Sequence, residues 1–136
     1  MLFRSGDAIF VPTDVSDEGQ VEGLIAETVD TYGALTTLVN NAASTDLLQR
    51  GDDEVTNVEL ASWEKVIRIT LTGTMLMCRQ AIPRMIDAGG GSIVNISSDS
   101  SLRAAIGFAA YGAAKAGVNS LTRRSEEHSL NSSHRP

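Results

Sequence analysis

Short apolar runs alternate along the chain with longer segments of mixed polarity, and the short runs predict strands. They lie at 8–11 (AIFV), 36–40 (TTLVN) and 92–97 (SIVNIS). Runs this short and this apolar are typical of strands buried on both faces. We therefore expect three short, buried strands.

In the longer segments apolar residues recur three and four positions apart, which predicts amphipathic helices. The first helix lies between Asp17, an N-cap residue with Gln20 three positions later, and the terminating Gly33. The second runs from about residue 61 to residue 88 and carries a wide apolar stripe. A third helix is expected to contain AAYGAAKAG at 109–117.

The alternation of strands and helices predicts an α/β fold, with a parallel sheet covered by helices on both sides. In such sheets ligands bind beyond the carboxyl ends of the strands. Five polar residues follow these ends in the sequence: Asp14, Asn40, Asn41, Ser97 and Ser98. We expect a binding site at this edge of the sheet.

Tyr111 and Lys115 lie four positions apart in the third predicted helix, so they share one helix face. A free phenol transfers protons poorly at neutral pH, and a neighbouring ammonium favours the phenolate. The pair therefore indicates acid/base chemistry. A surface helix with Tyr and Lys at helical spacing is the alternative interpretation.

The composition is that of one soluble globular domain: 136 residues, 42% hydrophobic and 21% charged. A net charge of −6 argues against a nucleic-acid partner. The sequence has neither the apolar core of a signal peptide nor a run of about 18 apolar residues, so we expect no membrane segment and a cytoplasmic location. Cys78 lies in an apolar helical pattern and is interpreted as a buried packing thiol.

An acidic cluster, Asp52, Asp53 and Glu54, lies in an irregular polar stretch after the second predicted strand. Its simplest interpretation is a solvated loop. We expect no metal site, and His128 and His134 are given no metal or catalytic role.

Four sequence features occur in the order found in one family: TDVSD at 13–17, LVNNAA at 38–43, GSIVNISS at 91–98 and YGAAK at 111–115. On these features the chain resembles the short-chain dehydrogenase/reductase family from about Ala8 to Arg123. The resemblance implies part of a Rossmann-type, doubly wound parallel sheet, namely strands 3, 4 and 5 of the family fold with their helices.

The resemblance also implies oxidation of an alcohol or reduction of a carbonyl with NAD or NADP, between which the sequence does not select. Tyr111 would be the general acid/base, Lys115 would assist it and bind the nicotinamide ribose, and Ser98 would donate to the substrate oxygen. The residues implied in cofactor binding are Asp14, Val15, Asn40, Asn41, Ala42, Tyr111 and Lys115. The partner would be a small-molecule alcohol or carbonyl, and family members commonly form oligomers through two long helices.

Two positions depart from the family pattern. Thr70 stands in the segment ITLTG, where the family usually has an Asn that supports a proton-relay water through a local helix distortion. Ala43 replaces the commoner glycine of NNAG. Because a threonine lacks the amide group, a non-catalytic dinucleotide-binding or regulatory protein is the alternative function. A serine hydrolase using Ser97 or Ser98 is disfavoured, since the G-x-S-x-G elbow is absent.

The family's glycine-rich phosphate loop does not occur in this sequence. Residues 1–123 are therefore interpreted as a partial NAD(P)-binding domain and the chain as an internal fragment, which by itself we expect to be unstable and inactive. Residues 124–136 have no apolar periodicity, and RSEEHSLNSSH resembles a translated DNA-sequencing adapter; a processed biological C-terminus is the alternative interpretation. We expect these residues to form a disordered tail outside the fold.

Overall fold

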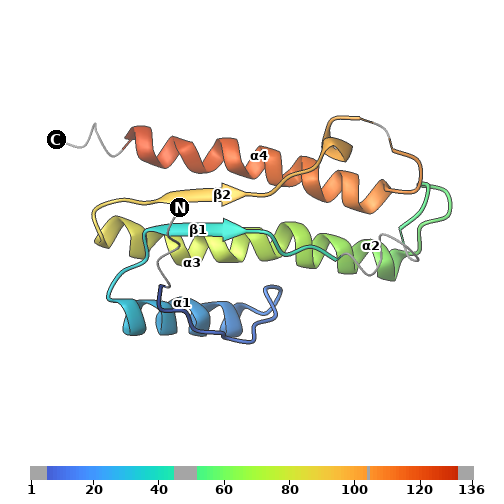
Figure 1. Ribbon diagram of the computed structural model, residues 1–136. Helices are drawn as coiled ribbons and strands as arrows, with labels where there is room; N and C mark the ends of the chain where they lie inside the picture. The colour runs from blue at the N-terminus through green and yellow to red at the C-terminus, as the bar shows by residue number, and fades with distance from the viewer. Residues whose placement is uncertain (1–5, 45–51, 104, 132–136) are drawn as a thin grey trace, which may run out of the picture.

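Two parallel strands, β1 (Thr37–Asn40) and β2 (Ser92–Asn95), form the sheet of the computed structural model, which describes residues 6–44, 52–103 and 105–131 (Figure 1). Leu38 stands opposite Ile93, and Asn40 stands opposite Asn95. The helix-rich connection between the strands confirms an α/β fold with a small parallel sheet. Both strands lie within the predicted segments 36–40 and 92–97.

In the described part of the chain, four α-helices accompany the strands: α1 (Glu18–Tyr32), α2 (Leu60–Val66), α3 (Gly73–Asp87) and α4 (Ala109–Asn131). A π-helical segment, Ile67–Thr72, joins α2 to α3, so residues 60–87 form one continuous helical run. This run confirms the helix predicted at 61–88. A single 3-10 turn, Asp99–Ser101, precedes α4.

The caps of α1 confirm both predicted ends of this helix. The Asp17 carboxylate accepts a hydrogen bond from the Gln20 amide over 2.9 Å, which satisfies a free N–H of the first turn. Gly33 has a φ of 81°, in the left-handed region that favours glycine, and its amide donates to the Val29 carbonyl.

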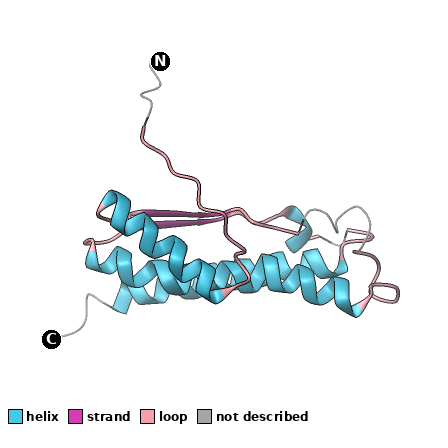
Figure 2. Ribbon diagram, turned by 90° about the horizontal axis from the view of Figure 1, so that it is seen from below, coloured by secondary structure: helices cyan, strands magenta, loops and turns pink. Residues whose placement is uncertain are grey.

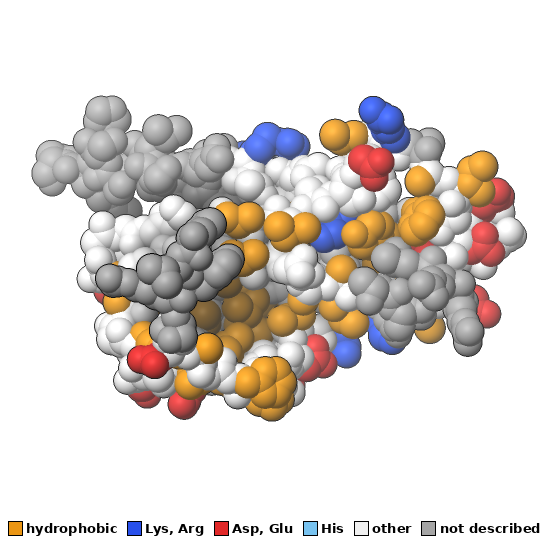
Figure 3. Space-filling model, in the orientation of Figure 1, with side chains coloured by type: hydrophobic (Ala, Val, Ile, Leu, Met, Phe, Trp, Pro, Cys, Tyr) orange, Lys and Arg blue, Asp and Glu red, His pale blue; other side chains and the backbone are white. Residues whose placement is uncertain are grey.

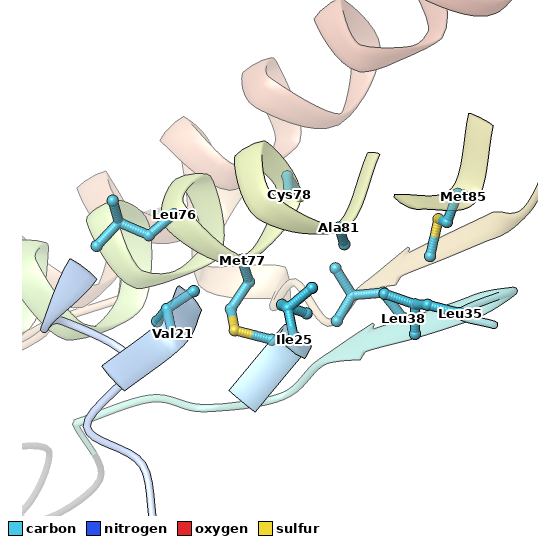
Figure 4. Packing of buried hydrophobic residues seen from close by; sticks show 9 residues of the cluster. All are labelled: Val21, Ile25, Leu35, Leu38, Leu76, Met77, Cys78, Ala81 and Met85. Carbon is cyan, nitrogen blue, oxygen red and sulfur yellow. The ribbon is translucent and has the colours of Figure 1, made fainter. Parts of the chain in front are cut away.

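The main core lies between α1, α3 and the inner face of the sheet, as Figure 4 shows. Its buried members are Val21, Ile25, Leu35, Leu38, Leu76, Met77, Cys78, Ala81 and Met85. Cys78 is a buried packing thiol, as predicted, and burial raises its pKa. The apolar stripe predicted from the sequence thus forms the buried face of α3.

Small residues allow α4 to pack closely on the continuous helix. Ala110 and Ala114 are fully buried against Val66 in a second cluster. A Cβ at Gly117 would lie only 2.7 Å from Leu71 Cδ2, so a larger residue there would push the helices apart. This close packing explains the alanines and glycines that surround Tyr111 and Lys115.

The helices lie on one face of the two strands (Figure 2), whereas helices on both faces were expected. Side chains alternate along the strands, so Leu38 is buried while Val39 is 58% exposed and Val94 is 47% exposed. We call the sheet face that carries Val39 and Val94, which no helix in the described residues covers, the bare face. Hydrophobic side chains gather in its middle in Figure 3.

The prediction of a strand at 8–11 is wrong, because residues 8–11 are irregular in this structure and Phe10 is 88% exposed. Within the described residues β1 pairs only with β2, so this apolar run has no ladder partner. A strand gains its backbone hydrogen bonds from a neighbour, and hydrophobic sequence alone does not supply one.

The helix α4 extends to Asn131, so the expectation of a disordered tail from residue 124 is wrong as far as Asn131. Residues 132–136 lie outside the described residues. No helix in the described part of the chain is long and apolar enough to cross a membrane.

Candidate active site

Lys115 lies on the inner face of α4, with only 3% of its surface exposed. Its ammonium donates to the carbonyl oxygen of Ile96, just beyond β2, over 2.5 Å. Burial removes water from the charged form and lowers the pKa of this lysine. The contact fixes an ammonium group just beyond the carboxyl end of β2.

Tyr111 lies near Lys115, and the lysine nitrogen is 5.6 Å from the centre of the tyrosine ring. The ring is half-buried and is tilted by 59° against the ring of Phe108, 6.4 Å away. The structure therefore brings together the phenol and the ammonium that were predicted to share a helix face.

Asp52 holds the first turn of α4, a role that sequence reasoning missed. Its two carboxylate oxygens accept the amide hydrogens of Ala110 (2.9 Å) and Tyr111 (2.8 Å). The prediction of a purely solvated acidic loop is wrong for this residue. An acidic residue suits a helix N-terminus, but its separation of 58 positions from Ala110 hides the pairing in the sequence.

Ser98 begins the 3-10 turn that follows β2. Its hydroxyl shares a hydrogen bond of 2.7 Å with the Ser100 hydroxyl and accepts the Ser100 amide over 3.3 Å. The turn packs on the start of α4, because a Cβ at Gly112 would lie 3.0 Å from the Ser100 carbonyl oxygen. Ser98 is thus on a loop that contacts the helix turn carrying Tyr111.

Thr70 lies in the π-helical segment and is fully buried. Within the described part of the chain, its hydroxyl oxygen has no hydrogen-bond partner, although the Thr70 carbonyl accepts the Thr74 hydroxyl over 2.8 Å. The next residue, Leu71, packs on Gly117 of α4. The structure therefore has an unsatisfied hydroxyl in a distorted helix that packs against α4.

The Asn40 side chain forms its hydrogen bonds within the fold, to Asn95 of β2 and to Cys78 of α3. Its amide nitrogen donates to the Asn95 side-chain oxygen over 2.8 Å and to the Cys78 sulfur over 3.5 Å. Asn95 in turn donates to the Thr122 hydroxyl on α4 over 3.0 Å. The sequence did not indicate a role for Asn95, because nothing in its neighbours distinguishes it from other strand residues. Its role follows from the register of the two strands, which sets it opposite Asn40.

The remaining predicted cofactor residues are near the surface. One Asp14 carboxylate oxygen accepts hydrogen bonds from the Ser16 hydroxyl and amide, which lower the pKa of the Asp14 carboxyl. Val15 packs against the start of α3, where a Cβ at Gly73 would lie 2.8 Å from its methyl carbon. Asn41 and Ala42 are exposed just beyond β1. The described residues contain no group of three or more side chains suited to a metal ion.

This arrangement has counterparts among known proteins. The family model described as "short chain dehydrogenase" matches residues 2–131. The chain belongs to the short chain dehydrogenase family. The match extends beyond the range of 8–123 over which the sequence features were recognised.

Individual members of the family show the same likeness. The chain is 42% identical over 113 residues to 2-(R)-hydroxypropyl-CoM dehydrogenase of Xanthobacter autotrophicus, covering 83% of this chain and 44% of the relative. A short chain dehydrogenase from Mycobacterium smegmatis is 36% identical, with a TM-score of 0.79 over 87% of this chain and 48% of that structure. NAD+-bound xylitol dehydrogenase is 27% identical, with a TM-score of 0.76 over 83% of this chain and 42% of that structure.

The chain spans less than half the length of the curated relatives it matches. The structural neighbours confirm a partial Rossmann-type fold, of which the described residues contain two parallel strands and not the three expected. As a short chain dehydrogenase segment, it combines an oxidoreductase fold with the Tyr111 and Lys115 pair at the start of α4.

Proposed function

We propose that the whole protein is an NAD(P)-dependent oxidoreductase that interconverts a small alcohol and its carbonyl by hydride transfer, with Tyr111 as the acid/base. The observation that carries the proposal is the pair on α4, in which a buried Lys115 ammonium lies 5.6 Å from the Tyr111 ring. The dehydrogenase family membership supports the reaction class.

Lys115 is the positive group of the proposed site. Its contact with the Ile96 carbonyl uses one of the three N–H donors of an ammonium, so two donors remain for a ribose hydroxyl and for neighbouring oxygen atoms. The lysine side chain is shielded from water, and its nitrogen lies 5.6 Å from the centre of the Tyr111 ring. Tyr111 gives a proton to the substrate oxygen in reduction and takes it back in oxidation.

Ser98 orients the substrate oxygen in this proposal. A serine hydroxyl rotates freely, so Ser98 can exchange its hydrogen bond with Ser100 for one to a substrate oxygen on which negative charge develops. The turn that holds Ser98 packs on the first turn of α4, at Gly112 next to Tyr111.

NAD or NADP supplies or accepts the hydride when it is bound. Asp14 fits a role beside the adenine ring, because its carboxylate is exposed and its hydrogen bonds with Ser16 fix its orientation. Asn41 and Ala42 are exposed beyond β1, where family ligands bind. To Asn40 we assign a role in bracing the sheet, since its side chain is bound to Asn95.

A second candidate function is non-catalytic dinucleotide binding, which Thr70 favours. Its buried hydroxyl lies where the family's relay asparagine usually stands, and it has no partner among the described residues. If the relay is impaired, Thr70→Asn in the full reading frame should raise turnover strongly. An unchanged rate in an already active protein would argue against impairment.

The proposal is tested by measuring oxidation of NAD(P)H, and reduction of NAD(P), with a panel of small carbonyls and alcohols. The protein is expressed from the full reading frame that contains this segment. Tyr111→Phe should lower kcat by a factor on the order of 10² to 10⁴, the usual contribution of a general acid/base. Tyr32→Phe is the matched control, because Tyr32 is 45% exposed on α1, and it should retain full activity. Equal activity of both variants would contradict the role of Tyr111.

A further inference from the structure

The N-terminus of α4 is capped by a segment that is distant in the sequence. The Asp53 carbonyl accepts the Ala109 amide over 3.2 Å, and the Asp52 carboxylate accepts the next two amides, those of Ala110 and Tyr111. Three of the amides that a helix leaves unpaired at its start therefore bind this one dipeptide.

The sequence next to α4 offers no substitute for this cap. Residues 105–108 are Ala, Ile, Gly and Phe, none of which has a side-chain acceptor. Helices usually begin at Ser, Thr, Asp or Asn for this reason. Without Asp52 the Ala110 and Tyr111 amides lose their protein acceptor, and the first turn of α4 is free to fray.

That first turn carries the proposed acid/base. The Tyr111 main chain is held by Asp52 through its amide, while its ring lies against Phe108. Lys115 is fixed separately, through Ile96 at the end of β2. Asp52 thus holds the amides of Ala110 and Tyr111 by side-chain hydrogen bonds that do not involve the lysine, in addition to the Asp53 carbonyl and the packing of Ala110 on Val66.

We propose that Asp52 is a positioning residue for the reaction assigned to Tyr111. Its carboxylate fixes where α4 begins and so places the phenol relative to Lys115 and the substrate oxygen. The inference rests on the proposed function. In this inference Asp52 binds no substrate and acts through the main-chain amides of the first turn of α4, which carries Tyr111.

Asp53 provides the matched control. It is the adjacent acidic residue, but among the described residues its carboxylate accepts only the local amide of Glu54. The Asp53 carbonyl that accepts the Ala109 amide belongs to the backbone, so Asp53→Ala keeps it. The two alanine variants remove the same charge from neighbouring positions and differ in the cap.

The test compares Asp52→Ala, Asp52→Asn and Asp53→Ala in the protein from the full reading frame, with kcat expressed per bound cofactor. Asp52→Ala should lower kcat about tenfold or more with a nearly unchanged KM for cofactor, because displacement of about 1 Å costs on the order of 10² in rate. Asp52→Asn keeps one of the two acceptor oxygens and turns an NH2 group toward the other amide, so its kcat should lie between those of Asp52→Ala and the unchanged protein. Asp53→Ala should match the unchanged protein.

Amide hydrogen exchange provides a readout that does not depend on turnover. Asp52→Ala should accelerate exchange at Ala110 and Tyr111 while leaving the amides of α1 unchanged. The inference is overturned if these two amides keep their protection, if kcat per bound cofactor stays within about twofold, or if Asp52→Asn loses as much rate as Asp52→Ala. If the unchanged protein has no turnover, the proposed function fails, and the exchange comparison alone decides whether Asp52 sets the start of α4.

Discussion

Asn40 and Asn95 stand directly opposite each other in the parallel pair β1 and β2, and the Asn40 amide nitrogen donates to the Asn95 side-chain oxygen over 2.8 Å. The Asn95 amide continues the chain of hydrogen bonds to the Thr122 hydroxyl on α4. Two strands and the helix of the proposed site are therefore joined by side chains. The parallel register makes this possible, because it brings the two amides side by side.

Asn95→Ala should lower the free energy of unfolding by about 1–3 kcal/mol, since it leaves the partly buried amide of Asn40 without its closest acceptor. Denaturant unfolding of the protein from the full reading frame measures the change. Asn41→Ala is the control, because Asn41 is exposed beyond β1, and its effect should be within about 0.5 kcal/mol. Equal effects of the two substitutions would contradict the bracing role.

Thr70→Val removes a buried hydroxyl that has no partner among the described residues and keeps the side-chain shape. The free energy of unfolding should rise by about 1 kcal/mol or more, because the cost of burying an unpaired polar group disappears. Thr74→Val is the matched control. It removes a bonded hydroxyl from the same helix and should lower stability by about 0.5–1.5 kcal/mol. A loss of stability in Thr70→Val would contradict this prediction.

Lys115 should make the stability of the protein depend on alkaline pH. Burial lowers its pKa below the ordinary 10.5, so the unfolded chain binds more protons in the window between the lowered pKa and 10.5. The free energy of unfolding therefore rises with pH across that window. Unfolding at a series of pH values measures the slope.

Lys115→Met should abolish this rise and the activity together. The raised pKa of Cys78 acts in the opposite direction above its ordinary 9.0, because the folded protein then keeps the extra proton. The Cys78 contribution is the same in the unchanged protein and in Lys115→Met, so it cancels when the pH slopes of their unfolding free energies are subtracted. Identical pH slopes in the two proteins would contradict the prediction.

The bare face of the sheet should cause the 136-residue chain to self-associate when it is purified by itself. Val39 and Val94 stand opposite each other on this face and are both about half exposed. Light scattering should show association that increases with protein concentration. A monomeric chain that unfolds cooperatively and oxidises NAD(P)H would contradict both the expected instability and the expected inactivity.

The double substitution Val39→Lys with Val94→Glu should reduce that association, because it places an opposite-charge pair on the bare face. Val55→Lys is the control, since Val55 is 82% exposed in a turn outside the sheet. Association that is lowered equally by both changes would indicate a general charge effect rather than contact through the sheet.

Sequencing of the source DNA across both ends of the reading frame, with adapter trimming, tests the interpretation of residues 124–136. We expect the frame to run upstream into a glycine-rich strand–turn–helix and to diverge from RSEEHSLNSSH after Arg123. An unchanged sequence through Pro136 would contradict the adapter hypothesis.

The sequence by itself determined the features that depend on near neighbours in the chain. Apolar spacing and caps predicted α1, with Asp17 and Gly33 at its ends. The same spacing predicted the helical run at 60–87. Tyr111 and Lys115 share a helix face because the α-helix repeats every 3.6 residues, which is a local property.

Only the tertiary structure decided the contacts between distant segments. The apolar run at 8–11 has the composition of a strand, but its pairing depends on a neighbour that its own residues do not specify. Asp52 caps α4 and Asn95 meets Asn40 because the fold brings together residues that are 55 or more positions apart. Local propensities fix helices and turns, whereas hydrogen bonds between strands, loops and distant helix ends exist only after the chain has packed.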